Sequence, residues 1–255
     1  MRQSHFHDIY EIYYLVSGER NYLIGDRTYR ISTGDLVFIS PYELHRATNT
    51  SVPYNDSIVI NFSKTFLGDD RVWIEDELSP FASGRHVLSL PLPVRTRVEE
   101  IFRTMELEYR ERNIAFEGVI RAALAELLIV GIRHNRAASD KTNEYDDPHH
   151  QKISEIVRFI NDNYGRPITL DALSARFYIS PYHLSRLFKK MTGFTYVEYV
   201  ATVRIYAAQK LLRETKWKVQ RIMEHVGFQN LAHFGKVFKK TSGCTPLQYR
   251  KGSGV

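Results

Sequence analysis

The chain has 255 residues, 43% of them hydrophobic and 25% charged, which is typical of globular proteins with buried cores and allows two domains. No apolar run reaches the ~18 residues of a membrane span. The first ten residues lack the apolar segment of a signal peptide, so we expect no membrane association. The single cysteine, Cys244, excludes an intrachain disulfide and favours a reducing, cytoplasmic location.

Charge is distributed unevenly along the chain. Residues 151–255 contain 18 Lys and Arg against 6 Asp and Glu, a net charge of +12. Residues 1–150 contain 17 against 23, a net charge of −6. A compact segment with charge +12 is typical of a protein that binds the phosphate backbone of nucleic acid. Basic surfaces also bind acidic proteins and membranes, so charge alone does not decide between these partners.

The first 62 residues alternate short β-branched or aromatic runs with glycine- and proline-containing turn signals. The expected strands are residues 12–16, 21–24, 28–31, 36–39 and 57–62. Many short strands at this spacing predict a sandwich or a small barrel.

From residue 94 to residue 135 the hydrophobic period becomes helical. One expected helix carries a stripe made of Val98, Ile101, Met105 and Tyr109, and a more apolar helix follows at residues 119–132. The next residues have almost no apolar content and predict a linker. We therefore divide the chain into an N-terminal domain at 1–135, a linker at 136–150 and a C-terminal domain at 151–255.

Helix signals are clear in the C-terminal domain. An amphipathic helix is expected from Ile153, Ile156, Val157 and Ile160, ending near Gly165. The expected caps of later helices are Thr169 before 170–177, Ser180 before 181–191, and a Thr195–Glu198 capping box before a long helix through Leu212. Thr245 and Gln248 repeat that box near the C-terminus.

One stretch of sequence occurs twice, 50 residues apart. The first copy is His183, Phe188, Lys189, Lys190, Gly193, Thr195 and Tyr199; the second is His233, Phe238, Lys239, Lys240, Gly243, Thr245 and Tyr249. Identical residue types at identical spacings imply two copies of one structural unit. Each copy predicts a helix that ends at glycine and is followed by a new helix start, as expected for a paired helix-turn-helix.

The helix at 181–191 is the expected first recognition helix, because the second helix of such a motif enters the major groove. Leu184, Leu187 and Phe188 share one face and should be core. Tyr182, Ser185 and Arg186 lie largely opposite and are expected to read bases, with Arg186 able to fork onto a guanine.

The segment ITLDALSARFYISPYHLSRLFKKMTGFTYVEYVATVRIYAAQKLL, followed by GFQNLAHFGKVFKKTSGCTPLQYR, resembles the double helix-turn-helix domain of AraC/XylS transcription regulators. The shared elements are S-x-x-x-L-x-R-x-F-K, R-x3-A-x2-LL, V-G-F and T-P-x2-Y-R. The resemblance implies base-facing positions at Leu231, Ala232, Gly235 and Lys236 of the second recognition helix, with Asn230 at its cap. The expected phosphate contacts are Lys189, Lys190, His233, Lys239 and Lys240.

The two units differ in ways that predict unequal specificity. The small alanine usual before each turn is Ser174 in the first unit and Met223 in the second, and the second turn has one more residue. Ala232 and Gly235 have little hydrogen-bonding capacity. We therefore expect the Arg186 unit to read sequence and the Lys236 unit to contribute mostly affinity.

The N-terminal domain contains H-x-H-x3-E-x6-G, followed by Gly34-Asp35, Pro41 and His45. This pattern resembles the cupin barrel motifs, in which imidazoles and a carboxylate can hold a divalent metal, here His5, His7, Glu11 and His45. The same pattern recurs in AraC-type effector domains, many of which bind a small molecule without metal, and we expect no cofactor. The expected ligand-binding residues are His5, His7, Glu11, Tyr13, Tyr22, Phe38 and His45. Such an aromatic-rich set suits a sugar ring.

The expected fold is α+β with two domains: an N-terminal cupin-like β-barrel with a helical pair, and an all-α C-terminal double helix-turn-helix. The expected function is a ligand-responsive, sequence-specific regulator of promoter DNA, and not an enzyme. The resemblance implies a homodimer that activates genes through contact with RNA polymerase, and the aromatic-rich residues favour genes for carbohydrates or related metabolites. Two alternatives remain: a metal-dependent cupin enzyme fused to a DNA-binding domain, and a ligand-independent DNA-binding protein.

Overall fold

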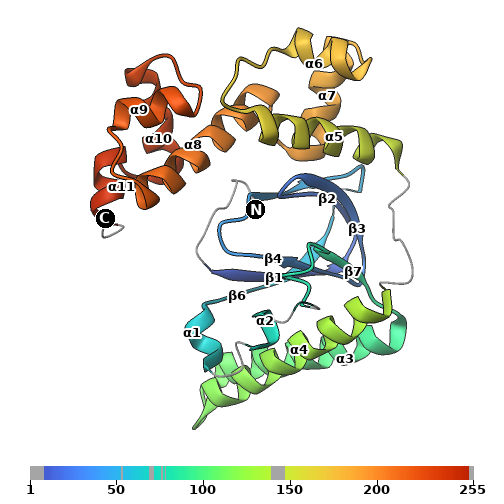
Figure 1. The fold of residues 1–255 in the computed structure, drawn as a ribbon. Coiled ribbons are helices and arrows are strands. Elements are labelled where there is room, and N and C mark those ends of the chain that lie inside the picture. Colours follow the sequence, from blue (N-terminus) through green and yellow to red (C-terminus); the bar gives the residue numbers. More distant parts are fainter. Residues whose placement is uncertain are drawn as a thin grey trace. The chain divides into compact units, whose positions relative to one another are not determined.

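The computed structural model describes residues 9–52, 54–68, 72–75, 77, 79–138 and 147–252, and its ribbon is drawn in Figure 1. The chain forms two compact units, Met1–Asp147 and Pro148–Val255. Among the residues described, no helix is both long enough and apolar enough to cross a membrane.

The N-terminal unit contains two antiparallel sheets (Figure 1). The strands are β1 (Tyr10–Ser17), β2 (Glu19–Ile24), β3 (Arg27–Ser32), β4 (Asp35–Ile39), β5 (His45–Asn49), β6 (Asp56–Phe62) and β7 (Val87–Ser89). One sheet has the order β6-β1-β4-β7 and the other β3-β2-β5. All five expected strands are present. The sequence did not reveal β5, whose residues HRATN lack an apolar run, or β7, which has only three residues.

Alternation along the strands divides the side chains between two cores. Tyr13 and Leu15 of β1 join Tyr22 of β2 and Val37 of β4 in a core between the two sheets. The intervening residues, such as Tyr14, belong to a second core on the opposite face of the four-stranded sheet.

Helices cover that opposite face, as Figure 1 shows for the long pair. They are α1 (Lys64–Leu67), α2 (Val72–Glu75), α3 (Leu92–Glu111) and α4 (Phe116–Ala138). Val98, Ile101 and Met105 of α3 are buried as expected. Tyr109 continues the predicted stripe but is 63% exposed, with the Arg112 guanidinium 5.3 Å from the centre of its ring, so the buried part of the stripe ends at Met105.

The C-terminal unit is all helical. Its helices are α5 (Pro148–Asn163), α6 (Leu170–Phe177), α7 (Pro181–Thr192), α8 (Tyr196–Glu214), α9 (Val219–His225), α10 (Leu231–Ser242) and α11 (Pro246–Gly252). Of the predicted linker, the three residues at each end are helical, in α4 and α5, and residues 139–146 lie outside the described ones.

The predicted helix caps are confirmed. The side chains of Thr169 and Ser180 accept hydrogen bonds from backbone N–H groups in the first turns of α6 and α7. Thr195 and Glu198 form the reciprocal capping box of α8, and Thr245 with Gln248 repeats it before α11. These bonds satisfy donors that a helix start leaves unpaired, so short polar sequences set the boundaries.

The duplicated residues make the same packing contact in both helix-turn-helix units of the C-terminal unit. The rings of Phe188 and Tyr199 meet edge to face with centroids 5.6 Å apart, and those of Phe238 and Tyr249 do so at 5.6 Å. The Tyr199 hydroxyl donates to Asn161 Oδ1 at 2.9 Å in α5. The repeat therefore encodes a scaffold that fixes each recognition helix against the following helix.

Tyr178 provides a test of local strain. It ends α6 in the left-handed region, with φ 52° and ψ 47°, and its side chain is 96% exposed. A side chain there is strained and buries nothing, so Tyr178→Gly should raise the free energy of unfolding by about 0.5–1 kcal/mol. Urea unfolding of the full chain in a Trp73→Phe background would report through Trp217, the remaining tryptophan.

Gly227 is the matched control for this substitution. It occupies the equivalent turn of the second unit with φ 90°, and an added Cβ would lie 2.9 Å from the carbonyl oxygens of Tyr164 and Gly165. Gly227→Ala should therefore destabilise the C-terminal unit, to which Tyr178 also belongs. A loss of stability in Tyr178→Gly would contradict the assignment of strain.

Candidate DNA-binding surface and sensor-domain polar cluster

The first recognition helix, α7, separates core residues from candidate reading residues as expected. Leu184, Leu187 and Phe188 are buried, whereas Tyr182, Ser185, Arg186 and Lys189 are exposed. The Arg186 guanidinium donates to the Tyr182 hydroxyl at 3.4 Å and lies 5.6 Å from the centre of its ring. The Tyr182 side chain therefore orients Arg186 along the outer face of the helix.

The second recognition helix, α10, presents a less polar face. Leu231, Ala232 and Lys236 are exposed and Gly235 is half-buried, while Phe234 and Phe238 are in the core. The Asn230 side chain accepts from the His233 N–H at 2.8 Å and so caps the helix. This cap uses the Asn230 carbonyl oxygen and leaves only its amide N–H groups for a base.

The candidate phosphate contacts lie at matching places in the two units. Lys189 and Lys190 are exposed in the last turn of α7, and Lys239 and Lys240 are exposed in the last turn of α10. Lysines at a helix C-terminus also interact favourably with the helix dipole. His233 is exposed, with its ring 5.7 Å from that of Phe228.

The second helix-turn-helix unit has the longer turn, as expected, but by two residues and not by the one counted from the sequence. Three residues separate α6 from α7, whereas five separate α9 from α10. Ser174 and Met223, which take the place of the usual alanine, are both buried, and Met223 belongs to the core of the second unit. The larger side chain is therefore packed within the helix crossing.

Arg204, which is the arginine of R-x3-A-x2-LL, connects the two helix-turn-helix units of the C-terminal unit. Its Nε donates to the Tyr164 carbonyl at 2.8 Å and its Nη2 to the Arg166 carbonyl at 2.9 Å, both just beyond α5. Its guanidinium also lies 5.8 Å from the centre of the Phe228 ring in the second turn. The motif could have indicated this residue, but not its partners, which are backbone atoms far away in sequence.

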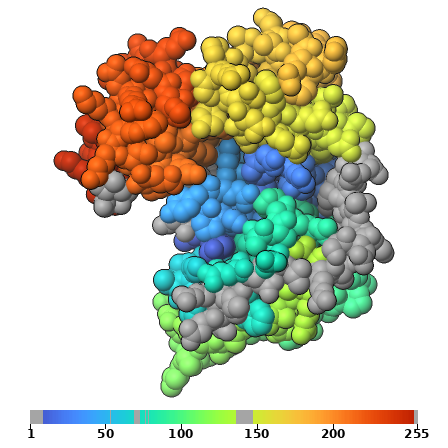
Figure 2. All heavy atoms as spheres, viewed as in Figure 1, coloured from blue at the N-terminus to red at the C-terminus, as the bar shows by residue number. Residues whose placement is uncertain are grey.

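The same region brings two backbones together. The Gly227 turn lies against Tyr164 and Gly165, and an added Cβ at Gly165 would be 3.2 Å from the His225 carbonyl oxygen. Figure 2 shows the yellow surface of the first unit adjoining the orange surface of the second. Glycine at both positions permits this approach. The two helix-turn-helix units therefore pack directly on each other and are also joined through α8.

The core between the sheets contains a cluster of buried polar side chains. The Tyr22 hydroxyl donates to Glu11 Oε1 at 3.3 Å, and His45 Nε2 lies 3.8 Å from Glu11 Oε2. The rings of Tyr13 and Tyr22 meet edge to face at 5.3 Å. Four predicted ligand-binding residues, Glu11, Tyr13, Tyr22 and His45, are therefore brought together. We call these four residues the interior cluster.

Of the other predicted ligand residues, Phe38 does not join this cluster. The ligand-binding role of Phe38 stays a prediction, but its side chain packs on the helix-covered face of the sheet, edge to face with Phe81 at 5.2 Å, and so lies apart from the interior cluster. The reason is strand alternation, which points Val37 and Ile39 between the sheets instead. His5 and His7 lie outside the described residues, and within the described part of the chain no group of three or more metal-binding side chains comes together.

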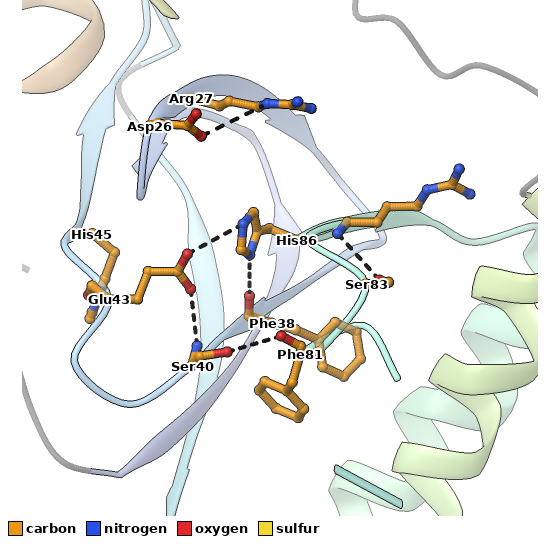
Figure 3. Close-up of polar contacts among 10 residues, drawn as sticks. Asp26, Arg27, Phe38, Ser40, Glu43, His45, Phe81, Ser83 and His86 are labelled. Atoms are coloured by element: carbon orange, nitrogen blue, oxygen red, sulfur yellow. Dashed lines mark hydrogen bonds and ion pairs between the residues drawn. The ribbon is translucent and has the colours of Figure 1, made fainter. Parts of the chain in front are cut away.

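A second polar pair, Glu43 and His86, adjoins the interior cluster (Figure 3). Glu43 Oε2 accepts from the Ser40 N–H at 3.1 Å, and Glu43 Oε1 lies 3.3 Å from His86 Nε2. The Glu43 carbonyl accepts from His45 Nδ1 at 2.8 Å, which connects the pair to the cluster. Burial raises the pKa of the Glu43 carboxyl, and the nearby His86 only partly opposes this shift. Sequence patterns did not indicate either residue.

Comparison with known proteins agrees with both halves of this architecture. A family model described as an AraC-like ligand binding domain matches residues 1–128, and one described as a helix-turn-helix domain matches residues 173–252. The chain belongs to the AraC family of transcriptional regulators. It combines the family's ligand-binding domain with its helix-turn-helix DNA-binding domain.

Several AraC-type relatives align with most of the chain. The uncharacterized HTH-type transcriptional regulator YfiF of Bacillus subtilis (strain 168) is 28% identical over 251 residues, 96% of this chain and 78% of that protein. The HTH-type transcriptional activator RhaR of Mannheimia succiniciproducens is 23% identical over 96% of this chain and 86% of its own length.

Other similarities cover only part of the chain. The bifunctional transcriptional activator/DNA repair enzyme AdaA of Bacillus subtilis is 38% identical over 106 residues, 42% of this chain and 50% of that protein. The solved C-terminal domain of the response regulator yesN from Fusobacterium nucleatum is 36% identical over 38% of this chain and 94% of that one, with a TM-score of 0.36.

The Arg204 contacts predict that replacing this arginine destabilises the AraC-family protein. Lysine cannot make both backbone bonds in the planar geometry of a guanidinium, so Arg204→Lys should lower the free energy of unfolding by about 1–3 kcal/mol. The matched control is Arg166→Lys, which changes an exposed side chain but keeps the carbonyl that Arg204 binds. Equal stability of the two variants in urea unfolding would refute the connecting role of Arg204.

The Glu43 shift predicts a pH dependence. A raised pKa means that the folded state binds the proton more tightly, so ionisation of Glu43 costs stability as pH rises above about 4. Glu43→Gln should raise the melting temperature of the N-terminal unit at neutral pH, with the difference disappearing near pH 4. A variant that is less stable than wild type at neutral pH would show that the ionised Glu43–His86 pair is stabilising.

Proposed function

We propose that this AraC-family protein is an effector-responsive activator of genes for carbohydrates or related metabolites. Effector sensing is assigned to residues 1–135 and DNA binding to residues 151–255. The observation that carries the proposal is the pairing of two exposed recognition helices with a polar cluster buried inside a separate unit. Buried tyrosines with a carboxylate and an imidazole offer the apolar walls and hydrogen bonds that a sugar needs.

The activator role is supported by relatives. The proteins of Mannheimia succiniciproducens and Cronobacter sakazakii that match over nearly the whole chain are named transcriptional activators. Activation would require contact with RNA polymerase bound at the same promoter. A regulator of this kind acts where the chromosome is, in agreement with the cytoplasmic location expected from the sequence.

We also propose that the protein works as a homodimer. Large apolar side chains are exposed where α3 and α4 meet, including Leu107, Tyr109, Ile114 and Val119. The α3–α4 end of one copy would cover that of another, because such exposed groups together favour association.

An enzymatic role is less well supported. The relatives that align over most of the chain are named as transcriptional regulators, and AdaA, which is also an enzyme, matches over only 42% of it. Glu11 and His45 alone would provide two metal ligands in the described part of the cluster. We therefore favour reversible ligand binding over catalysis.

Selection of bound fragments from the source genome tests the function most directly. The full-length protein would be incubated with sheared genomic DNA, and the retained fragments would be sequenced with and without extracts of small metabolites. Enrichment of a few promoter fragments next to metabolic genes supports the proposal. Uniform retention of all DNA would instead indicate a sequence-independent DNA-binding protein.

Arg186 and Lys236 should have different effects on DNA binding. Arg186→Ala should relax discrimination at one base position by about 1–3 kcal/mol, because a bidentate contact to guanine is lost. Lys236→Ala should weaken binding to all sequences similarly and reduce the slope of log affinity against log salt by about 1. Fluorescence anisotropy on operator variants at several salt concentrations measures both effects. A larger change of sequence preference in Lys236→Ala would reverse the assignment.

A further inference from the structure

Arg20 is a buried cation without an anionic partner in the described part of the chain. The residue is only 8% exposed. Nη1 donates to the neutral amide oxygen of Asn55 at 2.6 Å, and Nε has no hydrogen-bond partner among the described residues. By contrast, Arg30 on the next strand pairs with Glu19 at 2.6 Å. Burying an unpaired charge is costly, so its retention requires a reason.

The position of Arg20 places it beside the interior cluster. It lies two residues before Tyr22 on β2, so strand alternation puts the two side chains on the same face, between the sheets. Burial raises the pKa of the Tyr13 and Tyr22 hydroxyls, and the Arg20 charge acts against this rise at both. Arg20 therefore lies close enough to both hydroxyls for its charge to affect them.

The combined set has opposite chemistry at its two ends. Glu11 and His45 form one end, 3.8 Å apart, where hydroxyl groups of a ligand could donate to the carboxylate. Along the β2–β5 pair Arg20 is opposite Asn49 and Ile24 is opposite His45, so Arg20 lies at the other end of β2 with Tyr22 between. Such a site is suited to a small molecule that has hydroxyl groups at one end and an anion at the other.

We propose that Arg20 binds the carboxylate of the effector, which makes the effector a sugar acid and not a neutral sugar. This inference rests on the proposed sensing function of the N-terminal unit. Asn55 occupies Nη1, so Nε and Nη2 remain as the parallel pair of donors that matches the two oxygens of a carboxylate. A neutral sugar would leave the buried charge unpaired.

A purely structural role for Arg20 makes a different prediction. If Arg20 is kept to hold the segment between β5 and β6 through Asn55, its removal lowers stability in the absence of ligand. If it is kept for a ligand, replacing it by an apolar side chain of similar length removes the cost of an unpaired buried charge. Arg20→Met should then melt at the same or a higher temperature than wild type without ligand.

The test uses thermal shift and calorimetry on the full-length protein with matched pairs of compounds. The pairs are glucuronate with glucose, galacturonate with galactose, and gluconate with sorbitol. Wild type is compared with Arg20→Met and with Arg30→Met, which removes an exposed arginine from the neighbouring strand. We expect at least one acid to raise the melting temperature and its neutral partner not to do so. We expect Arg20→Met to lower the affinity for that acid by about 10- to 100-fold. We expect Arg30→Met to leave this affinity unchanged.

Three outcomes would overturn the proposal. The first is a neutral sugar that binds as tightly as its acid, which would leave the proposed sensing function intact. The second is an acid that binds Arg20→Met as well as wild type. The third is no shift with any acid together with a lower melting temperature of ligand-free Arg20→Met, which would assign Arg20 to structure and also remove support for sugar sensing.

Discussion

The geometry of the DNA-binding unit depends on the contacts of Arg204 with the end of α5. Two charged hydrogen bonds to backbone carbonyls join α8 to the first helix-turn-helix, and the guanidinium also faces Phe228 of the second. The Gly227 turn packs on the same backbone segment. Burial lowers the pKa of Arg204, so part of its solvation is given up for these contacts. Two recognition helices held in this way form one reader and not two tethered ones.

The two helix-turn-helix units share a scaffold and differ on the exposed faces of their recognition helices. The Phe188–Tyr199 and Phe238–Tyr249 contacts are the same in both units, as are the glycine ends and the paired lysines. The exposed face changes from a tyrosine-held arginine on α7 to small and apolar groups around a lysine on α10. This asymmetry supports a division in which the first unit selects the site and the second adds affinity.

Local signals in the sequence predicted the helices and caps of the C-terminal unit, because capping and amphipathic patterns act within a few residues. The interior cluster was partly predicted, since Glu11 and His45 belong to a recognisable motif. Phe38 lies apart from the cluster because the facing of one strand residue depends on register, which only the assembled sheet determines. The role of Arg20 and the partners of Arg204 could not be predicted, because the contacts are with residues 35 to 40 positions away in sequence.

The most direct test of a single rigid reader is the dependence of affinity on the spacing between the two half-sites. Recognition helices fixed on one scaffold should meet successive major grooves about 34 Å apart. Once the operator is known, one to five base pairs would be inserted between its half-sites and binding measured by anisotropy at fixed salt. A rigid reader predicts that every insertion lowers the affinity to that of a single half-site. Unchanged affinity across the insertions would show that the two units move independently and would contradict the account.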